Sequence, residues 1–107
     1  METTSDAVEQ DPLGLKRFAL TESAYDLVNT IRGTYGRLSH AESQKANSDQ
    51  ALINHWRNRS REVGRAYRRL NGDNLLAIDE FTKTVTAEWH QIAKVENERS
   101  LRLSHAS

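Results

Sequence analysis

The sequence predicts an all-α protein, and more specifically an antiparallel three-helix bundle. The only proline is Pro12, so no proline interrupts a helical backbone over the rest of the chain. In three separate segments, apolar residues recur at steps of three and four, the period of an amphipathic helix. Two polar stretches, residues 42–50 and 71–74, divide these segments. Helices joined by short turns lie antiparallel to their sequence neighbours, and this predicts the bundle.

The first helix is expected to begin at Thr21, because threonine suits the N-cap position. Leu20 and Tyr25 flank this position with the spacing of a hydrophobic staple. The apolar face that follows comprises Ala24, Leu27, Val28, Ile31, Tyr35 and Leu38.

The second helix is expected to begin at Asn47 or Ser48, with Gln50 placed for a capping box. The three-and-four spacing also continues from residue 28 to residue 70 if Glu42, Lys45 and Asp49 are accepted as polar core positions. A single long helix over residues 21–70, dimerising as a coiled coil, is therefore the alternative fold. The apolar face of the second helix comprises Leu52, Ile53, Trp56, Val63, Tyr67 and Leu70.

Between the second and third helices, Gly72 is expected to adopt the left-handed conformation that often follows a helix end. Asp73 or Asn74 is then expected to cap the third helix. The apolar face of this helix comprises Leu75, Ile78, Phe81, Val85, Trp89, Ile92 and Val95.

The register of the two hairpins predicts an aromatic layer at the centre of the bundle. If the chain reverses near Gly72, Trp56 lies opposite Trp89, and a reversal near residue 46 brings Tyr35 alongside Trp56. We also expect Gly33, Gly36 and Gly64 to permit close helix approach beside Trp56, because each glycine costs about 1 kcal/mol in a helix interior. The predicted core aromatic layer consists of Tyr35, Trp56 and Trp89.

Outside the helices, two tails are expected. Residues 1–19 are predicted to be a flexible acidic tail and lead-in, residues 20–100 the helical bundle and residues 101–107 a C-terminal tail. Hydrophobic residues make up 36% of the chain, so the core is thin and self-association would add to stability. The sequence shows neither a signal peptide nor a long apolar run, and we expect a soluble, cytoplasmic protein.

Arginine is concentrated in the second helix of a chain whose formal net charge is zero. Residues 55–70 contain six arginines and one glutamate. The candidate contact residues are Arg57, Arg61, Arg65 and Arg68, which step by four, four and three along one flank of the apolar face. Three hypotheses follow: ion pairs with the acidic residues of the third helix and the tail, contact with a nucleic acid, or contact with an anionic membrane surface or an acidic protein partner.

The nucleic-acid hypothesis has two further features. Trp56 and Tyr67 lie near the arginines and would stack on bases. The stretch INHWRNRSRE, residues 53–62, resembles the recognition helix of homeodomains, which has a tryptophan followed by asparagine and arginines. The resemblance covers these ten residues only, since no compact pair of short helices precedes them.

No catalytic residue, metal site or cofactor is predicted. The chain has no cysteine, and no two of its four histidines have the spacing that places two ligands on one helical face.

A repeated RLSHA stretch, at residues 37–41 and 102–106, would lie at one end of the bundle, because the first and third helices run parallel. The sequence thus predicts a non-enzymatic, self-associating helical module for protein–protein interaction or assembly, with nucleic-acid binding through the arginines as the alternative.

Overall fold

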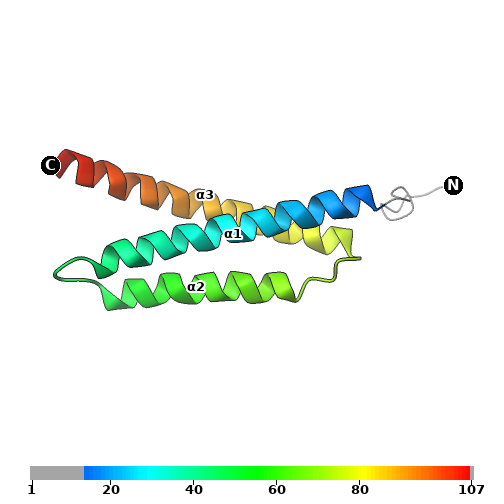
Figure 1. Ribbon diagram of the computed structural model, residues 1–107, viewed down its shortest axis with the longest axis horizontal. Helices are drawn as coiled ribbons and strands as arrows, with labels where there is room; N and C mark the ends of the chain where they lie inside the picture. Colours follow the sequence, from blue (N-terminus) through cyan, green and yellow to red (C-terminus); the bar gives the residue numbers. More distant parts are fainter. Residues whose placement is uncertain (1–13, 107) are drawn as a thin grey trace.

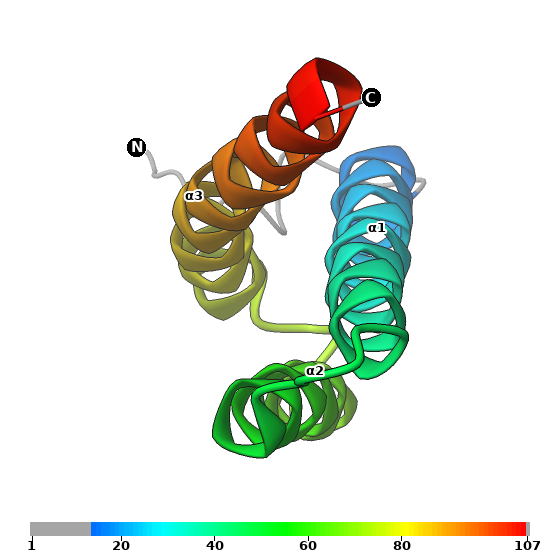
Figure 2. The same ribbon diagram turned by 90° about the vertical axis from the view of Figure 1, so that its left-hand side faces the viewer.

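The structure is a computed structural model that describes residues 14–106. It consists of three helices, α1 (Leu15–Ser43), α2 (Gln50–Arg68) and α3 (Leu75–Ala106) (Figure 1). The chain runs up, down and up again, so α2 is antiparallel to both neighbours, and the bundle measures 63 × 25 × 17 Å. Helix α1 packs against both other helices, while α2 and α3 lie further from each other (Figure 2). The predicted antiparallel three-helix bundle is confirmed.

The alternative of one long helix over residues 21–70 is wrong, and the reason lies in the residues that would have been its polar core. Helix α1 ends at Ser43 and α2 begins at Gln50. The carboxylate of Glu42 accepts a hydrogen bond from the backbone N–H of Asp49 at 2.9 Å. The Asp49 side chain in turn accepts one from the N–H of Leu52 at 3.2 Å. The two acids therefore stabilise a turn.

Both predicted helix starts before residue 50 are also wrong. Helix α1 begins at Leu15, and its N-cap is Gly14 in the left-handed conformation with φ 70°. Thr21 lies inside α1, where its hydroxyl donates to the carbonyl of Arg17 at 2.8 Å. The N-cap of α2 is Asp49, because its carboxylate reaches the orphan N–H of the first turn, and neither Asn47 nor Ser48 takes this role.

Helices α1 and α3 extend into the stretches that were predicted to be tails. Residues 15–19 belong to α1, and residues 101–106 belong to α3. Residues 1–13, most of the predicted acidic tail, lie outside the described residues.

The turn between α2 and α3 is built by asparagine side chains. Gly72 does not adopt the expected left-handed conformation, since Gly14 is the residue with positive φ in the described part of the chain. The Asn71 side chain accepts a hydrogen bond from the N–H of Asp73 at 2.9 Å. This bond closes the turn without a residue in the left-handed conformation. Asn74 caps α3 as predicted, accepting the N–H of Ala77 at 3.0 Å.

The core forms two adjoining clusters along α1. Tyr67 and Phe81 pack against both clusters and so join them. The central cluster contains the buried residues Val28, Ile31, Tyr35, Leu38, Trp56, Val63 and Val85, and the second cluster contains Ala24, Leu75 and Ile78.

The expected close approach of helices at glycine is not found at Gly36. A Cβ at this position would meet no atom within 4 Å, apart from its own helix backbone and chain neighbours. Because the penalty of glycine in an exposed helix interior has no compensating contact here, Gly36→Ala is expected to raise the free energy of unfolding by about 1 kcal/mol. Urea denaturation measures this change.

Gly64→Ala is the control for that substitution. A Cβ at Gly64 would lie 2.9 Å from Nη1 of Arg32, so the guanidinium must move and the gain is expected to be smaller. A loss of stability in Gly36→Ala would contradict the open space beside Gly36.

Candidate interaction surface

Four arginines of α2 form an exposed row that we call the arginine stripe: Arg57, Arg61, Arg65 and Arg68. Eleven positions of helix separate its ends, which corresponds to about 17 Å. Nη2 of Arg61 donates to the side chain of Asn58 at 3.2 Å. Within residues 14–106, no member of the stripe forms an ion pair with a carboxylate.

Some basic residues outside the stripe are neutralised within the bundle, whereas Arg69 at the C-cap of α2 is exposed and forms no ion pair between described residues. Arg59 lies on the same helix as the stripe, but it faces α3 and pairs with Glu88 (Nη2–Oε1 2.6 Å) as well as with Glu62 (Nη1–Oε1 2.6 Å). The predicted pairing of α2 arginines with acids of α3 is therefore found at Arg59 and not at the stripe. The basic residues with ion pairs in the described chain are Arg17, Arg37, Lys45, Arg59, Lys83 and Arg99.

The pair formed by Arg59 and Glu88 joins all three helices. The hydroxyl of Tyr35 on α1 donates to Oε2 of the Glu88 carboxylate. Burial opposes the ionisation of Glu88, but the hydrogen bonds from Arg59 and Tyr35 outweigh burial and lower the pKa of Glu88. Burial and the adjacent Glu88 raise the pKa of Tyr35 to about 12, so the phenol stays protonated and keeps donating.

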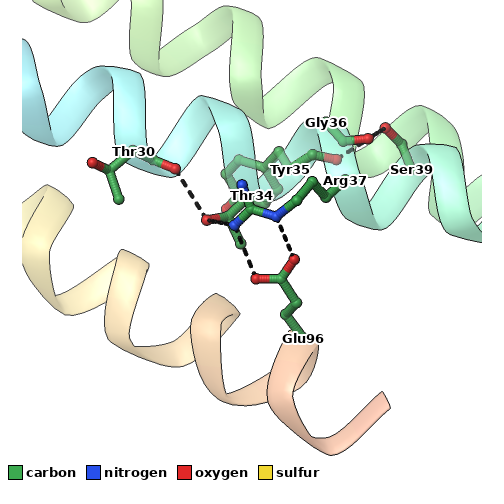
Figure 3. Close-up of polar contacts among 7 residues, drawn as sticks. All are labelled: Thr30, Thr34, Tyr35, Gly36, Arg37, Ser39 and Glu96. Atoms are coloured by element: carbon green, nitrogen blue, oxygen red, sulfur yellow. Dashed lines mark hydrogen bonds and ion pairs between the residues drawn. The ribbon is translucent and has the colours of Figure 1, made fainter. Parts of the chain in front are cut away.

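A second charged pair joins α1 to α3 (Figure 3). The guanidinium of Arg37 binds both carboxylate oxygens of Glu96, with Nε–Oε2 2.7 Å and Nη2–Oε1 3.0 Å. Nη2 also donates to the hydroxyl of Thr34 at 3.2 Å, and this hydroxyl donates to the carbonyl of Thr30. The hydrogen bonds to Glu96 raise the pKa of Arg37. This arginine is thus neutralised within the bundle, although its side chain remains 62% exposed.

At the end of α1, the buried Glu42 is surrounded by donors. Arg99 approaches its Oε1 to 2.6 Å and Lys45 to 3.1 Å, in addition to the N–H of Asp49. The N–H of Asp49, followed by Arg99 and Lys45, lowers the pKa of Glu42 to about 2. The ionised carboxylate therefore stabilises the folded state.

Glu42→Gln is expected to lower stability most at neutral pH. The folded pKa lies below the ordinary 4.5, so the ionised group contributes fully above pH 4.5, and its contribution is lost as pH falls from 4.5 towards 2. Urea midpoints of the two proteins measured between pH 2 and pH 7 should converge at the acid end. A constant difference between them over this range would contradict the role of the Glu42 charge.

Arg32 on α1 adds to the positive side of α2, and sequence reasoning missed it. Its Nε donates to the hydroxyl of Ser60 at 3.2 Å, and its guanidinium covers Gly64, where Nη1 of Arg68 also approaches. A chain reversal around residue 46 places residue 32 opposite residue 60, so the contact between Arg32 and Ser60 could have been predicted from the sequence. Beside it, Gly36, Arg57 and Arg61 line a hollow of about 190 Å³.

The predicted stacking on bases is wrong for Trp56, which is buried, and Tyr67 already packs against two other aromatic rings. Trp56 is only 4% exposed, and the guanidinium of Arg99 lies 5.3 Å from its ring centroid. Tyr67 is half-buried between Tyr25 and Phe81, with ring centroids 6.3 and 6.2 Å away. Any contact of the stripe with a nucleic acid would therefore be limited to phosphates.

The structure brings the three residues of the predicted aromatic layer into one cluster. Tyr35 and Trp56 are buried in it, while Trp89 packs against it and is half-buried. Nε1 of Trp89 is buried without a hydrogen-bond partner, and the ring of His90 lies 5.4 Å from the Trp89 ring. These residues support the helix that carries the stripe.

The two RLSHA stretches lie at the same end of the bundle, as their parallel helices predict. A hollow of about 690 Å³ separates the C-terminal parts of α1 and α3. Leu38 and Ala41 from the first stretch line it, together with Arg102 and Leu103 from the second. Leu101 is 52% and Leu103 69% exposed, so apolar side chains contribute to the surface at this end.

Searches for other kinds of site gave no positive finding. Residues 14–106 contain no group of three His, Asp or Glu side chains arranged to hold a metal ion. None of the three described helices is long and apolar enough to cross a membrane. Comparisons with protein-family models, with curated proteins and with solved structures returned no match to this chain. Fold and surface together define an elongated three-helix bundle with an arginine stripe that has no carboxylate partner among residues 14–106.

Proposed function

We propose that this protein is a non-enzymatic helical interaction module whose arginine stripe binds an acidic protein partner. The observation that carries the proposal is the contrast within α2. Arg59 is neutralised by Glu88 and Glu62, whereas the stripe on the same helix is exposed and has no carboxylate partner among the described residues. Charged surfaces of this kind guide and orient a partner of opposite charge.

An acidic protein fits the stripe better than a nucleic acid does. Nucleic-acid-binding domains are commonly basic overall and combine phosphate contacts with aromatic stacking. This chain is neutral overall, Trp56 is buried in the bundle, and Tyr67 packs partly buried against its core. Binding to phosphates through the stripe is the alternative, and it would show no base preference.

Self-association, which we also propose, requires a face other than the stripe. Two copies of the stripe repel each other because they carry the same charge. One exposed apolar surface lies at the C-terminal part of α3, where Leu101 is 52% and Leu103 69% exposed beside the hollow of about 690 Å³, and Leu15, Phe18 and Leu76 are exposed at the opposite end. A second copy covering this surface would leave the stripe free for the partner.

Fluorescence anisotropy with three labelled probes tests the proposal. The probes are a glutamate-rich peptide, single-stranded DNA and double-stranded DNA of equal net charge, each measured at low and moderate salt. The proposal predicts that the peptide binds with the highest affinity and that binding weakens as salt rises. Preferential binding of either DNA would establish the alternative, and no binding of any probe at low salt would contradict both.

A further inference from the structure

The end of the arginine stripe lies close to the point where residues 1–13 join the bundle. Gly14 and Gly72 line one hollow at this end of the molecule. Arg68 lines an adjoining hollow, which shares Thr21 and Gly72 with the first. The start of α1 and the turn after α2 accordingly lie at the same end of the bundle (Figure 1). Residues 1–13 are therefore attached next to the Arg68 end of the stripe.

The charges of residues 1–13 complement those of the stripe in number and sign. This segment, which we call the acidic segment, contains Glu2, Asp6, Glu9 and Asp11 and no basic residue. Since the whole chain has 15 basic and 15 acidic residues, the acidic segment carries a charge of −4 and the remaining residues carry +4. The zero net charge of the chain thus conceals two regions of opposite charge.

The spacing and reach of the acidic segment also suit the stripe. Glu2, Asp6 and Glu9 follow one another at steps of four and three, which are the steps from Arg61 to Arg65 and from Arg65 to Arg68. The stripe is about 17 Å long, whereas 13 residues span about 20 Å as a helix and about 43 Å when extended. An extended segment of this length reaches the whole stripe, whereas a fully helical one falls short of Arg57, because α1 begins beyond the Arg68 end of the stripe.

We infer that the acidic segment of each chain docks on its own arginine stripe. The contact pairs Glu2, Asp6 and Glu9 with Arg61, Arg65 and Arg68, which have no carboxylate partner among the described residues. Because the acidic segment is attached nearby, its effective concentration at the stripe is in the millimolar range, and a weak contact suffices.

This docking regulates the proposed binding site, and in that respect the inference rests on the proposed function. An acidic partner must displace the acidic segment before it occupies the stripe. The apparent dissociation constant for the partner then equals the intrinsic constant divided by the fraction of molecules in which the stripe is free. The docking itself is measurable without any partner.

A spin label at Ser5→Cys tests the docking directly. The chain has no cysteine, so this substitution gives a single labelling site within the acidic segment and leaves the charges unchanged. At low salt we expect the label to broaden the amide signals of residues 57–68. The broadening should disappear at high salt and in the double variant Arg61→Glu with Arg65→Glu.

Three outcomes would overturn the inference. Broadening confined to residues 14–20 would place the acidic segment at Lys16 and Arg17 instead. Absence of broadening would show that the segment stays away from the bundle. The third outcome concerns a mixture of two chains, one spin-labelled without isotope enrichment and the other isotope-enriched without a spin label. If the enriched chain shows the same broadening in this mixture as when it carries the label itself, the contact belongs to a second copy.

A binding experiment then measures the regulatory effect in the full-length chain. The variant Glu2→Gln, Asp6→Asn, Glu9→Gln and Asp11→Asn neutralises the acidic segment, and we expect it to bind the glutamate-rich peptide about fivefold more tightly than the unmodified chain. The control variant is Glu22→Gln, Asp26→Asn, Glu80→Gln and Glu98→Gln, which removes the same charge from helix positions that form no ion pair with another described residue.

Equal gains in the two variants would attribute the effect to net charge and overturn the regulatory role. If the spin label broadens the stripe signals but no variant binds the peptide, the docking is supported and the proposed function is overturned. The two hypotheses are thus separable.

Discussion

Replacement of Trp56 by alanine is expected to lower the free energy of unfolding by about 3–5 kcal/mol, the range for a buried aromatic side chain. Trp56 is 4% exposed and belongs to the central cluster, to which all three helices contribute. Its ring also supports the guanidinium of Arg99, which pairs with Glu42 across α1 and α3. Since domains of this size commonly have only about 5–15 kcal/mol of stability, much of the bundle is expected to unfold.

Urea denaturation followed by far-UV circular dichroism measures this loss without relying on the removed fluorophore. Trp89→Ala is the matched control, because Trp89 packs against the same cluster but is only half-buried. We expect it to cost about 1–2 kcal/mol. An unchanged melting curve for Trp56→Ala would contradict the packing of all three helices around this ring.

The largest expected effect on binding comes from reversing two charges at the centre of the arginine stripe. Arg61→Glu combined with Arg65→Glu removes two attractive charges and introduces two repulsive ones. Exposed charge pairs contribute up to about 1 kcal/mol each, so affinity for the glutamate-rich peptide is expected to fall by about 30-fold or more. Helix content should be unchanged, because both side chains are exposed and have no ion pair in the described chain.

The control for this variant reverses two other exposed basic residues. Lys94→Glu with Arg102→Glu on α3 produces the same change of net charge away from the stripe. An equal loss of affinity in both variants would mean that net charge alone drives binding. Melting of the bundle by the stripe variant would show that these arginines stabilise the fold, contrary to their exposure.

The fold class could be predicted because the apolar period is a property of each helix by itself. The faces containing Ile31, Trp56 and Val85 are the ones that meet in the core. Helix ends were harder, because several residues near each end have capping side chains and tertiary contacts select among them. Thr21 suits an N-cap, yet α1 continues back to Leu15, which lets Leu20 pack against the second core cluster.

The candidate surface could be predicted only in part for a related reason. A helical wheel places the stripe beside the apolar face, but it does not show which arginines meet a carboxylate. That depends on how α2 is rotated towards α3, which brings Arg59 to Glu88 and leaves Arg61 exposed. Arg32 lies on a different helix, so its approach to Gly64 became visible only with the helices assembled.

The most direct test of the central claim is to map the bound glutamate-rich peptide on the protein by NMR. The backbone amide shifts of the isotope-enriched chain are recorded as the peptide is added at low salt. The account predicts that the shifts concentrate on residues 57–68 of α2 and on Arg32 beside them. Shifts confined to α3, or spread evenly over the three helices, would contradict the arginine stripe as the partner-binding surface.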